Sequence, residues 1–347
     1  MKKSKVIVTG GLGYIGSHTV VELIQNGFEV VVFDNLSNSK AFILDRIYDI
    51  TNVKPIFELV DLANEVDADK AYKKHSDADS IINFAAFKAV GESVQKPMMY
   101  YKNNLYALIN SIEAQKKYNI KNFIFSSSAT VYGDPDVLPI TESQQTKRAF
   151  SPYGNTKKMA EEILEDFCKS NTEFKTICLR YFNPIGAHES GLIGELPNGI
   201  PNNLLPYVTQ CAAGILEQLQ VFGDDYNTKD GTAVRDYIHV VDLAKAHVKA
   251  LERLIYEKED TNFEVFNLGT GNGFTVLDII KTFEKVADKK LNYKIVGRRS
   301  GDVESLYAST KKAKEKLLWE AELSLEDMIK SSWNWEQSFR ALEKTIK

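Results

Sequence analysis

The stretch from residue 5 to residue 34 constrains the fold of this chain more than any other part of the sequence. It opens with an apolar, β-branched run at residues 6–8, which is typical of a strand buried on both faces. Three glycines at a spacing of three follow: Gly10, Gly13 and Gly16. A helical pattern comes next, and a second apolar strand ends at Asp34. This order of strand, glycine turn, helix, strand and acid predicts a dinucleotide-binding βαβ unit.

The chemistry of this unit depends on close approach. Residues without a Cβ let the backbone touch a pyrophosphate, and a helix N-terminus adds free N–H groups and a favourable dipole. Asp34 can accept hydrogen bonds from both hydroxyls of a ribose, and it would repel a 2′-phosphate. The pattern therefore favours NAD over NADP. The alternative is a glycine turn that serves strand–helix packing alone.

Length, charge and cysteine content narrow the class of protein. A chain of 347 residues predicts about two domains. The net charge of −4 and the absence of a basic block argue against nucleic acid or an anionic membrane as a partner, and no apolar run reaches transmembrane length. Cys168, Cys178 and Cys211 have no metal-ligand spacing, so no metal site is expected. We interpret them as small core residues of a cytoplasmic protein.

Alternating strand and helix patterns predict an α/β fold, a Rossmann-type doubly wound parallel sheet with a smaller mixed α/β C-terminal substrate lobe. After Pro184 the composition turns rich in loop residues. We expect residues 1–184, with about 236–270, to form the NAD-binding domain, and residues 185–235 and 271–347 to form the lobe. The strand at 263–268 should rejoin the first sheet.

In the second half of the chain, the sequence predicts helices at 206–216 and 240–256. The sequence from residue 298 to 306 is predicted to be a loop. Three tryptophans in the helix-rich tail are expected to pack in the core: Trp319, Trp333 and Trp335.

Tyr153 and Lys157 lie four residues apart where a helix pattern starts, so they share one helix face. A phenol has a pKa of about 10, and ionising it near pH 7 takes roughly 4 kcal/mol. A neighbouring ammonium and a positively charged nicotinamide ring can supply that energy. The pair would then act as a general base on a substrate hydroxyl during hydride transfer. The alternative is an exposed helix pair without a catalytic role.

Two polar positions at strand ends leave alternatives open. Ser128 follows the fifth strand on the carboxyl side, where α/β sheets bind ligands, and its hydroxyl could bridge the tyrosine and the reacting hydroxyl. It is one of three consecutive serines, and any of them could instead cap the strand end. Asp61 could bind an adenine or act as a helix N-cap.

Together with these features, several longer stretches resemble one family. They are residues 8–18, 34–36, 88–94, 122–133, 151–154, 179–184, 200–204, 231–240 and the Arg298-Arg299 and Gly301-Asp302 pairs. The sequence resembles the UDP-glucose 4-epimerase family of extended short-chain dehydrogenases/reductases over nearly its whole length. The resemblance implies an isomerase with tightly bound NAD, a UDP-sugar substrate and a homodimer. It implies redox at C4 through a 4-keto sugar, in galactose metabolism.

The resemblance also implies roles for individual residues. Tyr153 would be the acid/base, Lys157 its pKa modulator and a ribose ligand, and Ser128 the hydroxyl partner. Those three would also contact NAD, together with Gly10, Gly13, Tyr14, Ile15, Gly16, Asp34, Asn35, Asn38, Ser39, Asp61, Leu62, Phe84, Ala85, Lys88, Asn103 and Tyr181. The UDP-sugar would be held by Lys88, Ser128, Tyr153, Asn183, Asn203, Leu204, Phe222, Arg235, Tyr237, Arg299, Asp302 and Leu306.

One departure from the family pattern bears on specificity. Leu306, four residues after Asp302, stands where strict glucose/galactose epimerases carry a bulky tyrosine. Family members that accept N-acetyl sugars have smaller residues there. We therefore expect a wider sugar pocket, able to interconvert UDP-N-acetylglucosamine and UDP-N-acetylgalactosamine as well.

Three competing functions remain at this stage. A nucleotide-sugar 4,6-dehydratase on the same fold needs an acid pair beside the active-site hydroxyl, where this chain has Ala129 and Thr130. A plain dehydrogenase would need exchangeable cofactor. A non-catalytic NAD sensor would be expected to lack the Tyr153–Lys157 pair.

Overall fold

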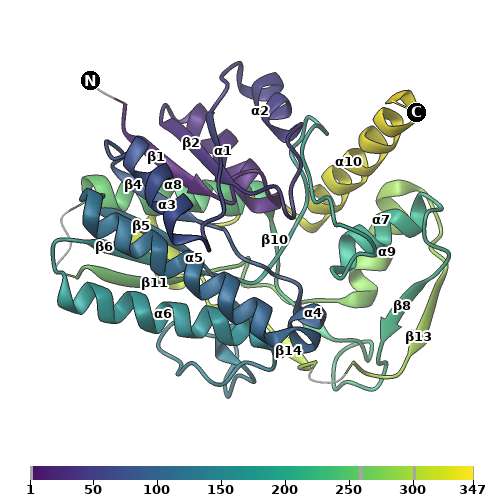
Figure 1. Ribbon diagram of the computed structural model, residues 1–347. Coiled ribbons are helices and arrows are strands. Elements are labelled where there is room, and N and C mark those ends of the chain that lie inside the picture. Colours follow the sequence, from purple (N-terminus) through teal and green to yellow (C-terminus); the bar gives the residue numbers. More distant parts are fainter. Residues whose placement is uncertain (1–2, 258–260, 300–301, 347) are drawn as a thin grey trace.

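The computed structural model describes residues 3–257, 261–299 and 302–346, and a seven-stranded parallel sheet lies at its centre (Figure 1). The strand order is β11-β6-β5-β4-β1-β2-β3. Its strands are β1 (Lys5–Thr9), β2 (Glu29–Asp34), β3 (Ile56–Leu59), β4 (Ser80–Asn83), β5 (Asn122–Ser128), β6 (Lys175–Tyr181) and β11 (Phe263–Leu268). The order reverses between β1 and β4, which is where a doubly wound sheet binds ligands.

Helices cover both faces of this sheet. One face carries α1 (Tyr14–Gln25), α2 (Ile43–Thr51) and α8 (Val240–Tyr256). The other carries α3 (Glu65–Lys74), α5 (Pro97–Tyr118) and α6 (Pro152–Ser170). The short helices α4 (Val90–Gln95) and η1 (Ala129–Tyr132) lie against α6.

Strand β1 shows why its sequence is apolar without alternation. Val6 and Val8 pack into the core on the α1 side, and Ile7 packs into the core on the α5 side. All three side chains are fully buried because helices cover both faces. The prediction of a doubly covered parallel sheet is confirmed.

Strand β11 lies at the edge of the sheet, far in sequence from its neighbour. It pairs in parallel with β6, from Phe263 opposite Thr176 to Leu268 opposite Tyr181. Helix α8, which precedes β11, packs against α1 on the first face of the sheet. The chain therefore returns to the sheet at β11, as the strand pattern at 263–268 predicts.

A smaller group of elements lies beside the carboxyl ends of the strands (Figure 1). It contains the pairs β7 (Asn183–Ile185) with β10 (Tyr237–His239) and β8 (Leu219–Phe222) with β13 (Tyr293–Val296). A third sheet joins β12 (Phe274–Thr275), β9 (Val234–Arg235) and β14 (Ser305–Leu306). Its helices are α7 (Leu204–Ala212), α9 (Val276–Ala287) and α10 (Leu325–Ile346), and η2 (Ala313–Leu317) lies against α8 and β11.

Two boundaries differ from the sequence-based expectation. The helix expected at 206–216 is α7, which begins after Asn203 and ends before Gly214, where a positive φ breaks the helix. The expected loop at 298–306 contains β14, because its pairing with β9 depends on residues some seventy positions away. The tryptophans pack as expected: Trp319 and Trp335 are buried, and Trp333 packs against the core of the smaller group.

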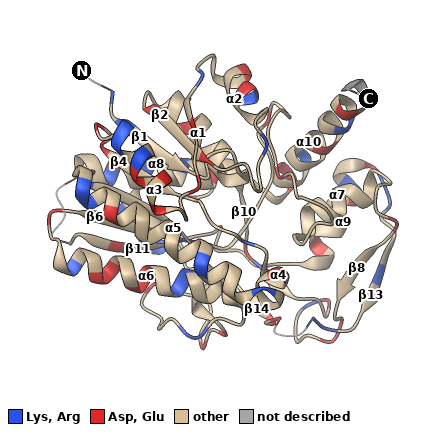
Figure 2. Cartoon of the chain, viewed as in Figure 1, with Lys and Arg blue, Asp and Glu red and all other residues tan. Residues whose placement is uncertain are grey.

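Charged residues of both signs lie along α6 and other helices (Figure 2). On α6 they form pairs one turn apart, such as Lys169 with Glu165 at 3.0 Å. No helix in the described part of the chain is long and apolar enough to cross a membrane. Within the same residues, no group of three or more His, Cys, Asp and Glu side chains could hold a metal ion.

Candidate active site

The glycine turn after β1 leaves the N-terminus of α1 open. No side chain caps this helix, and its first turn contains no acid. Gly10 has a φ of +67°, and a Cβ at Gly16 would lie 2.3 Å from the Gly10 carbonyl oxygen. Any side chain at these positions would therefore displace the turn. The free N–H groups and the helix dipole suit a pyrophosphate, so these residues fit a dinucleotide.

Asp34 ends β2 next to this turn and is 8% exposed. Its Oδ2 accepts a hydrogen bond from the Leu12 N–H at 3.0 Å. Its Oδ1 accepts from the Leu36 N–H at 2.9 Å and the Ser39 hydroxyl at 2.7 Å. A carboxylate has about four acceptor positions, so Asp34 fixes the turn and keeps capacity for a ribose hydroxyl.

The other predicted cofactor residues lie along the strand ends with local contacts. Asp61 accepts from the Ala63 N–H at 3.0 Å, whereas the N-cap of α3 is Asn64. The N-cap alternative for Asp61 is therefore wrong. Several others also have partners in the protein: Asn35 with the Ser37 N–H, Asn38 with Asn198, Asn103 with Asn104, and the Ala85 N–H with Thr9.

Two predicted residues meet at a histidine. The Tyr181 hydroxyl lies 2.6 Å from His247 Nε2, and the ring of Phe84 lies 4.9 Å from the His247 ring. Burial lowers the pKa of His247 to about 4, so the imidazole is neutral. Leu62 differs from these residues because its side chain is buried in the core on the α5 side.

Tyr153 and Lys157 lie in the first turns of α6, whose N-cap Ser151 accepts a hydrogen bond from the Gly154 N–H. The Lys157 ammonium donates to the Ser126 carbonyl at 2.6 Å and lies 5.9 Å from the Tyr153 ring centroid. This is the close pair that the four-residue spacing predicts.

The structure also distinguishes the three consecutive serines at the end of β5. Ser126 accepts the lysine through its carbonyl, and Ser127 donates its hydroxyl to Glu161. Ser128 accepts from the Thr130 hydroxyl at 3.0 Å, and its hydroxyl lowers the pKa of the nearby Tyr153 phenol. Of the three serines, Ser128 is therefore the one whose side chain acts on the tyrosine.

Burial dominates the electrostatics of the pair. It raises the pKa of the Tyr153 phenol to about 12, and the hydrogen bond with Ser128 offsets part of that rise. It lowers the pKa of Lys157 to about 8, partly opposed by the negative charge of Glu161. The sequence predicts that Lys157 helps to lower the pKa of the Tyr153 phenol toward neutral pH. The protein groups alone do not produce this lowering.

Residues from both parts of the fold meet at Glu195, which the sequence did not indicate. Its Oε1 accepts from Lys88 Nζ at 3.0 Å and from Asn203 Nδ2 at 2.7 Å. Tyr14 adjoins this group, because Lys88 Nζ lies 5.7 Å from its ring centroid. Lys88 and Asn203 lie far apart in sequence, and no local pattern singles out the glutamate between them.

The predicted phosphate and base ligands form two contacts in the smaller group of elements. Arg235 pairs with Asp302 and donates to the Val303 carbonyl at 2.8 Å. The Arg299 guanidinium lies 4.5 Å from the centroid of the Phe222 ring.

The last predicted sugar-site residues are spread over several elements. Leu306 pairs with Arg235 in the β14–β9 ladder and packs against the small cluster that includes Ala129 and Phe182. Asn183 donates its backbone N–H to the Asp236 carbonyl at 2.9 Å. Tyr237 is buried in the core of the smaller group of elements, which Leu204 also borders, and Ile15 borders the core on the α1 side.

Comparison with known proteins agrees with this arrangement. A family profile described as GDP-mannose 4,6 dehydratase matches residues 7–332. The UDP-glucose 4-epimerase of Pasteurella multocida is 53% identical over 332 residues, covering 96% of this chain and 97% of that protein. The Mus musculus protein of the same name is 49% identical over 339 residues, covering 96% of each.

Solved structures give the same result in three dimensions. UDP-glucose 4-epimerase from Bifidobacterium longum, in complex with NAD+ and UDP, aligns with a TM-score of 0.92 and 47% identity, covering 96% of this chain and 98% of that one. The Stenotrophomonas maltophila enzyme, with bound NAD and formylated UDP-arabinopyranose, aligns with a TM-score of 0.94 and 43% identity, covering 98% and 99%.

Fold and site together define the class: this is an extended short-chain dehydrogenase/reductase. Within that class, identities near one half over nearly the full length of both chains single out one group of enzymes. The chain belongs to the UDP-glucose 4-epimerase family.

Proposed function

We propose that this enzyme reversibly epimerises UDP-glucose and UDP-galactose at C4 through a 4-keto sugar, with tightly bound NAD. The observation that supports it most is the meeting of Tyr153, Lys157 and Ser128 at the carboxyl end of β5, two strands along the sheet from β1 and its open glycine turn. When bound, NAD supplies a reversible hydride acceptor. The residues of the chain supply proton transfer, orientation and anchoring.

Tyr153 takes the proton of the C4 hydroxyl as a phenolate and returns it from the phenol. The Ser128 hydroxyl bridges the phenol and the reacting oxygen, and the Lys157 ammonium stabilises the phenolate. Because epimerisation needs the 4-keto sugar to present its other face, the UDP part must be held more firmly than the sugar. Arg235 and Arg299 suit the diphosphate, since guanidinium groups donate paired, charge-assisted hydrogen bonds.

The cofactor residues at the glycine turn are proposed to act as follows. The N–H groups that follow Gly13 bind the pyrophosphate, and Asp34 binds the adenosine ribose. Lys88, which contacts Glu195 and lies near the Tyr14 ring, is proposed to contact both the cofactor and the UDP-sugar. The remaining cofactor and sugar residues predicted from the sequence keep their proposed roles as contacts. Residues 1–184 with about 236–270 are proposed as the cofactor domain, and the rest as the UDP-sugar lobe.

The dehydratase alternative has less support, although the matching family profile has a dehydratase name. Ser128 is followed by the buried Ala129 and by Thr130, whose hydroxyl donates to Ser128. Neither can act as the acid that water elimination requires. A purified sample given UDP-galactose without added NAD tests the proposal: conversion to UDP-glucose supports it, and a requirement for added NAD with release of NADH would favour a dehydrogenase.

We also propose that N-acetylated UDP-sugars are substrates. Leu306 borders the cluster that contains Ala129, next to Ser128, so a larger side chain there would reduce the space on the sugar side. Among the structural relatives is the UDP-Glc/GlcNAc 4-epimerase from Campylobacter jejuni, with 35% identity and a TM-score of 0.83. UDP-N-acetylgalactosamine offered beside UDP-galactose tests this: conversion of UDP-galactose alone would contradict it.

A homodimer is proposed through α5. Met98, Tyr106 and Ile109 expose apolar side chains on this helix, with Tyr106 52% exposed. Light scattering should give the mass of a dimer for the native chain and of a monomer for Tyr106→Glu. Val66→Glu, at an exposed apolar position on α3, is the matched control and should remain dimeric.

A cytoplasmic location is proposed from the cysteines. All three thiols are free, and Cys168 and Cys178 are buried. This usage is typical of a reducing compartment. Fractionation of cells that express a tagged full-length chain tests it.

A further inference from the structure

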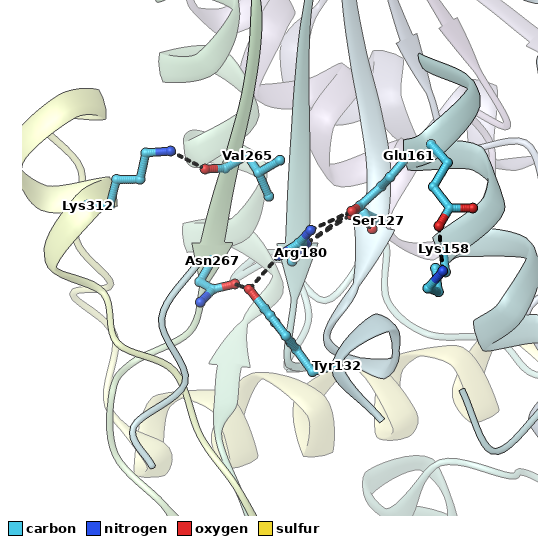
Figure 3. A network of polar contacts seen from close by, with 9 residues as sticks. Ser127, Tyr132, Lys158, Glu161, Arg180, Val265, Asn267 and Lys312 are labelled. Atoms are coloured by element: carbon cyan, nitrogen blue, oxygen red, sulfur yellow. Dashed lines mark hydrogen bonds and ion pairs between the residues drawn. The ribbon is translucent and has the colours of Figure 1, made fainter. Parts of the chain in front are cut away.

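A buried ion pair lies one helical turn beyond Lys157. The Glu161 carboxylate accepts from Arg180 Nε at 3.0 Å and Nη2 at 2.6 Å, and also from the Ser127 hydroxyl (Figure 3). Glu161 is 6% exposed and Arg180 5% exposed. Desolvation makes such a pair costly, and its net contribution to stability is often small. Stability alone therefore does not account for a buried ion pair at this position, next to the proposed catalytic groups.

The pair belongs to a longer network across the sheet (Figure 3). Arg180 Nη1 donates to the Tyr132 hydroxyl at 2.8 Å, which donates to Asn267 Oδ1 at 2.7 Å. The network therefore joins α6, the end of β5, η1, β6 and β11. Each side chain of this network makes at least one hydrogen bond to the next, so the network ties these elements together.

The end of β5 is held to α6 at two successive residues. The Ser126 carbonyl accepts from Lys157, and the Ser127 hydroxyl donates to Glu161. Ser128, the residue that faces Tyr153, comes next. The Glu161 contact thereby ties the helix that carries Tyr153 to the residue that precedes this serine.

Glu161 also supplies the negative charge nearest to Lys157 along the helix. The buried titratable groups on the elements packed against α6 are Cys178, Arg180 and Tyr181 on β6, Tyr132 on η1 and Tyr100 on α5. Two half-buried groups also lie there: Glu92 on α4, and Tyr101 on α5, whose hydroxyl accepts from Asn155 Nδ2 at 2.9 Å. Arg180 pairs with Glu161, and Glu92 with Lys96 and Tyr100. The Cys178 thiol and the three buried phenols are neutral because burial raises their pKa values.

We propose that Glu161 is a positioning residue of the active site: it holds the helix that carries Tyr153 and Lys157 against the end of β5 and places its negative charge one helical turn from Lys157. This rests on the proposed roles of those two residues. A negative charge favours the protonated form of nearby groups. Loss of the Glu161 charge should therefore lower the pH at which Lys157 and Tyr153 titrate.

The test compares Glu161→Gln with Tyr132→Phe. Glutamine keeps an acceptor for Ser127 and Arg180 but removes the charge. Phenylalanine breaks the same network beyond Arg180 and leaves Glu161 in place. The titration is followed without substrate by NMR of protein labelled with nitrogen-15 in its lysines. The chemical shift of Lys157 Nζ reports the protonation of this residue, and the signal is assigned by its absence from Lys157→Met.

We expect the titration midpoint of Lys157 to fall by at least about half a pH unit in Glu161→Gln and to remain unchanged in Tyr132→Phe. In Glu161→Gln, the pH at which kcat for UDP-galactose declines should fall by the same amount. An unchanged midpoint in Glu161→Gln, or an equal change in both variants, would overturn the proposal. Failure of the epimerase assignment would instead appear as an inactive native enzyme with this titration intact.

Should Glu161→Gln not fold, the double variant Glu161→Leu with Arg180→Met replaces the pair with apolar side chains, a change that buried pairs often tolerate. The lysine midpoint should again fall. A midpoint equal to that of the native protein would refute the role of Glu161.

Discussion

Replacing Lys157 with methionine tests the assignment of the catalytic pair most directly. The substitution keeps an unbranched side chain of similar length and removes the ammonium that lies 5.9 Å from the Tyr153 ring centroid. The Ser126 carbonyl loses a hydrogen bond of 2.6 Å at the same time. In the proposed mechanism the phenolate of Tyr153 accepts the substrate proton, so its stabilisation by the ammonium bears directly on the rate.

The magnitude follows from the geometry. Two unit charges about 6 Å apart at an effective dielectric constant of about 20 attract by about 3 kcal/mol. If that energy is lost from the transition state, kcat falls roughly 100-fold. The ammonium is present below its pKa of about 8 and is lost as the pH rises through that value. Native activity should therefore decline above pH 8, and Lys157→Met should lack this decline.

The assay is the conversion of UDP-galactose to UDP-glucose by purified enzyme between pH 6 and pH 10, with no added NAD. Bound NAD is quantified in each sample, because Lys157 is also a proposed ribose ligand. A Lys157→Met enzyme with full NAD content and less than about a fivefold loss of kcat would refute the electrostatic role. So would persistence of the alkaline decline in that variant.

Three further predictions follow from the same contacts. Burial lowers the pKa of Lys157 from 10.5 to about 8, so the unfolded chain binds more protons than the native protein between these pH values. As the pH rises from 8 to 10.5, the free energy of unfolding of the native protein should therefore increase by about 3 kcal/mol relative to that of Lys157→Met, as measured by urea unfolding. Gly16→Ala places a Cβ 2.3 Å from the Gly10 carbonyl oxygen. It should lower NAD retention at least about tenfold and the free energy of unfolding by about 1–3 kcal/mol. The control Gly91→Ala, with open space around its Cβ, should retain NAD. Leu306→Tyr should lower kcat/KM for UDP-N-acetylgalactosamine at least about tenfold and leave that for UDP-galactose within a fewfold; an undiminished N-acetyl activity would show that Leu306 does not limit the pocket.

The interpretation of residues 5–34 from sequence holds because every interaction that defines the βαβ unit is local. The glycine spacing, the helix period and the acid at the end of β2 all lie within one short stretch, and β1 pairs with β2 directly. The Tyr153–Lys157 pair is local in the same sense, since a four-residue spacing on a helix fixes the proximity of the side chains. These features could be predicted without knowledge of the rest of the fold.

Tertiary structure decided the features that join distant segments. The choice of Ser128 over Ser127 depends on Glu161, which approaches from another element. Glu195 connects Lys88 and Asn203, which are more than one hundred residues apart. Strand β14 exists because β9 pairs with it, and no periodicity in its two residues predicts that.

Sequence by itself therefore determined the class of fold and the cofactor motif, and it predicts Tyr153 and Lys157 as the reacting side chains, because local geometry and residue chemistry set these features. It did not determine the protonation of those side chains. The pKa values of Tyr153 and Lys157 are shifted mainly by burial, and burial is produced by the packing of α6 against the sheet. Only the tertiary structure brings the surrounding charges and apolar groups to the distances at which they act.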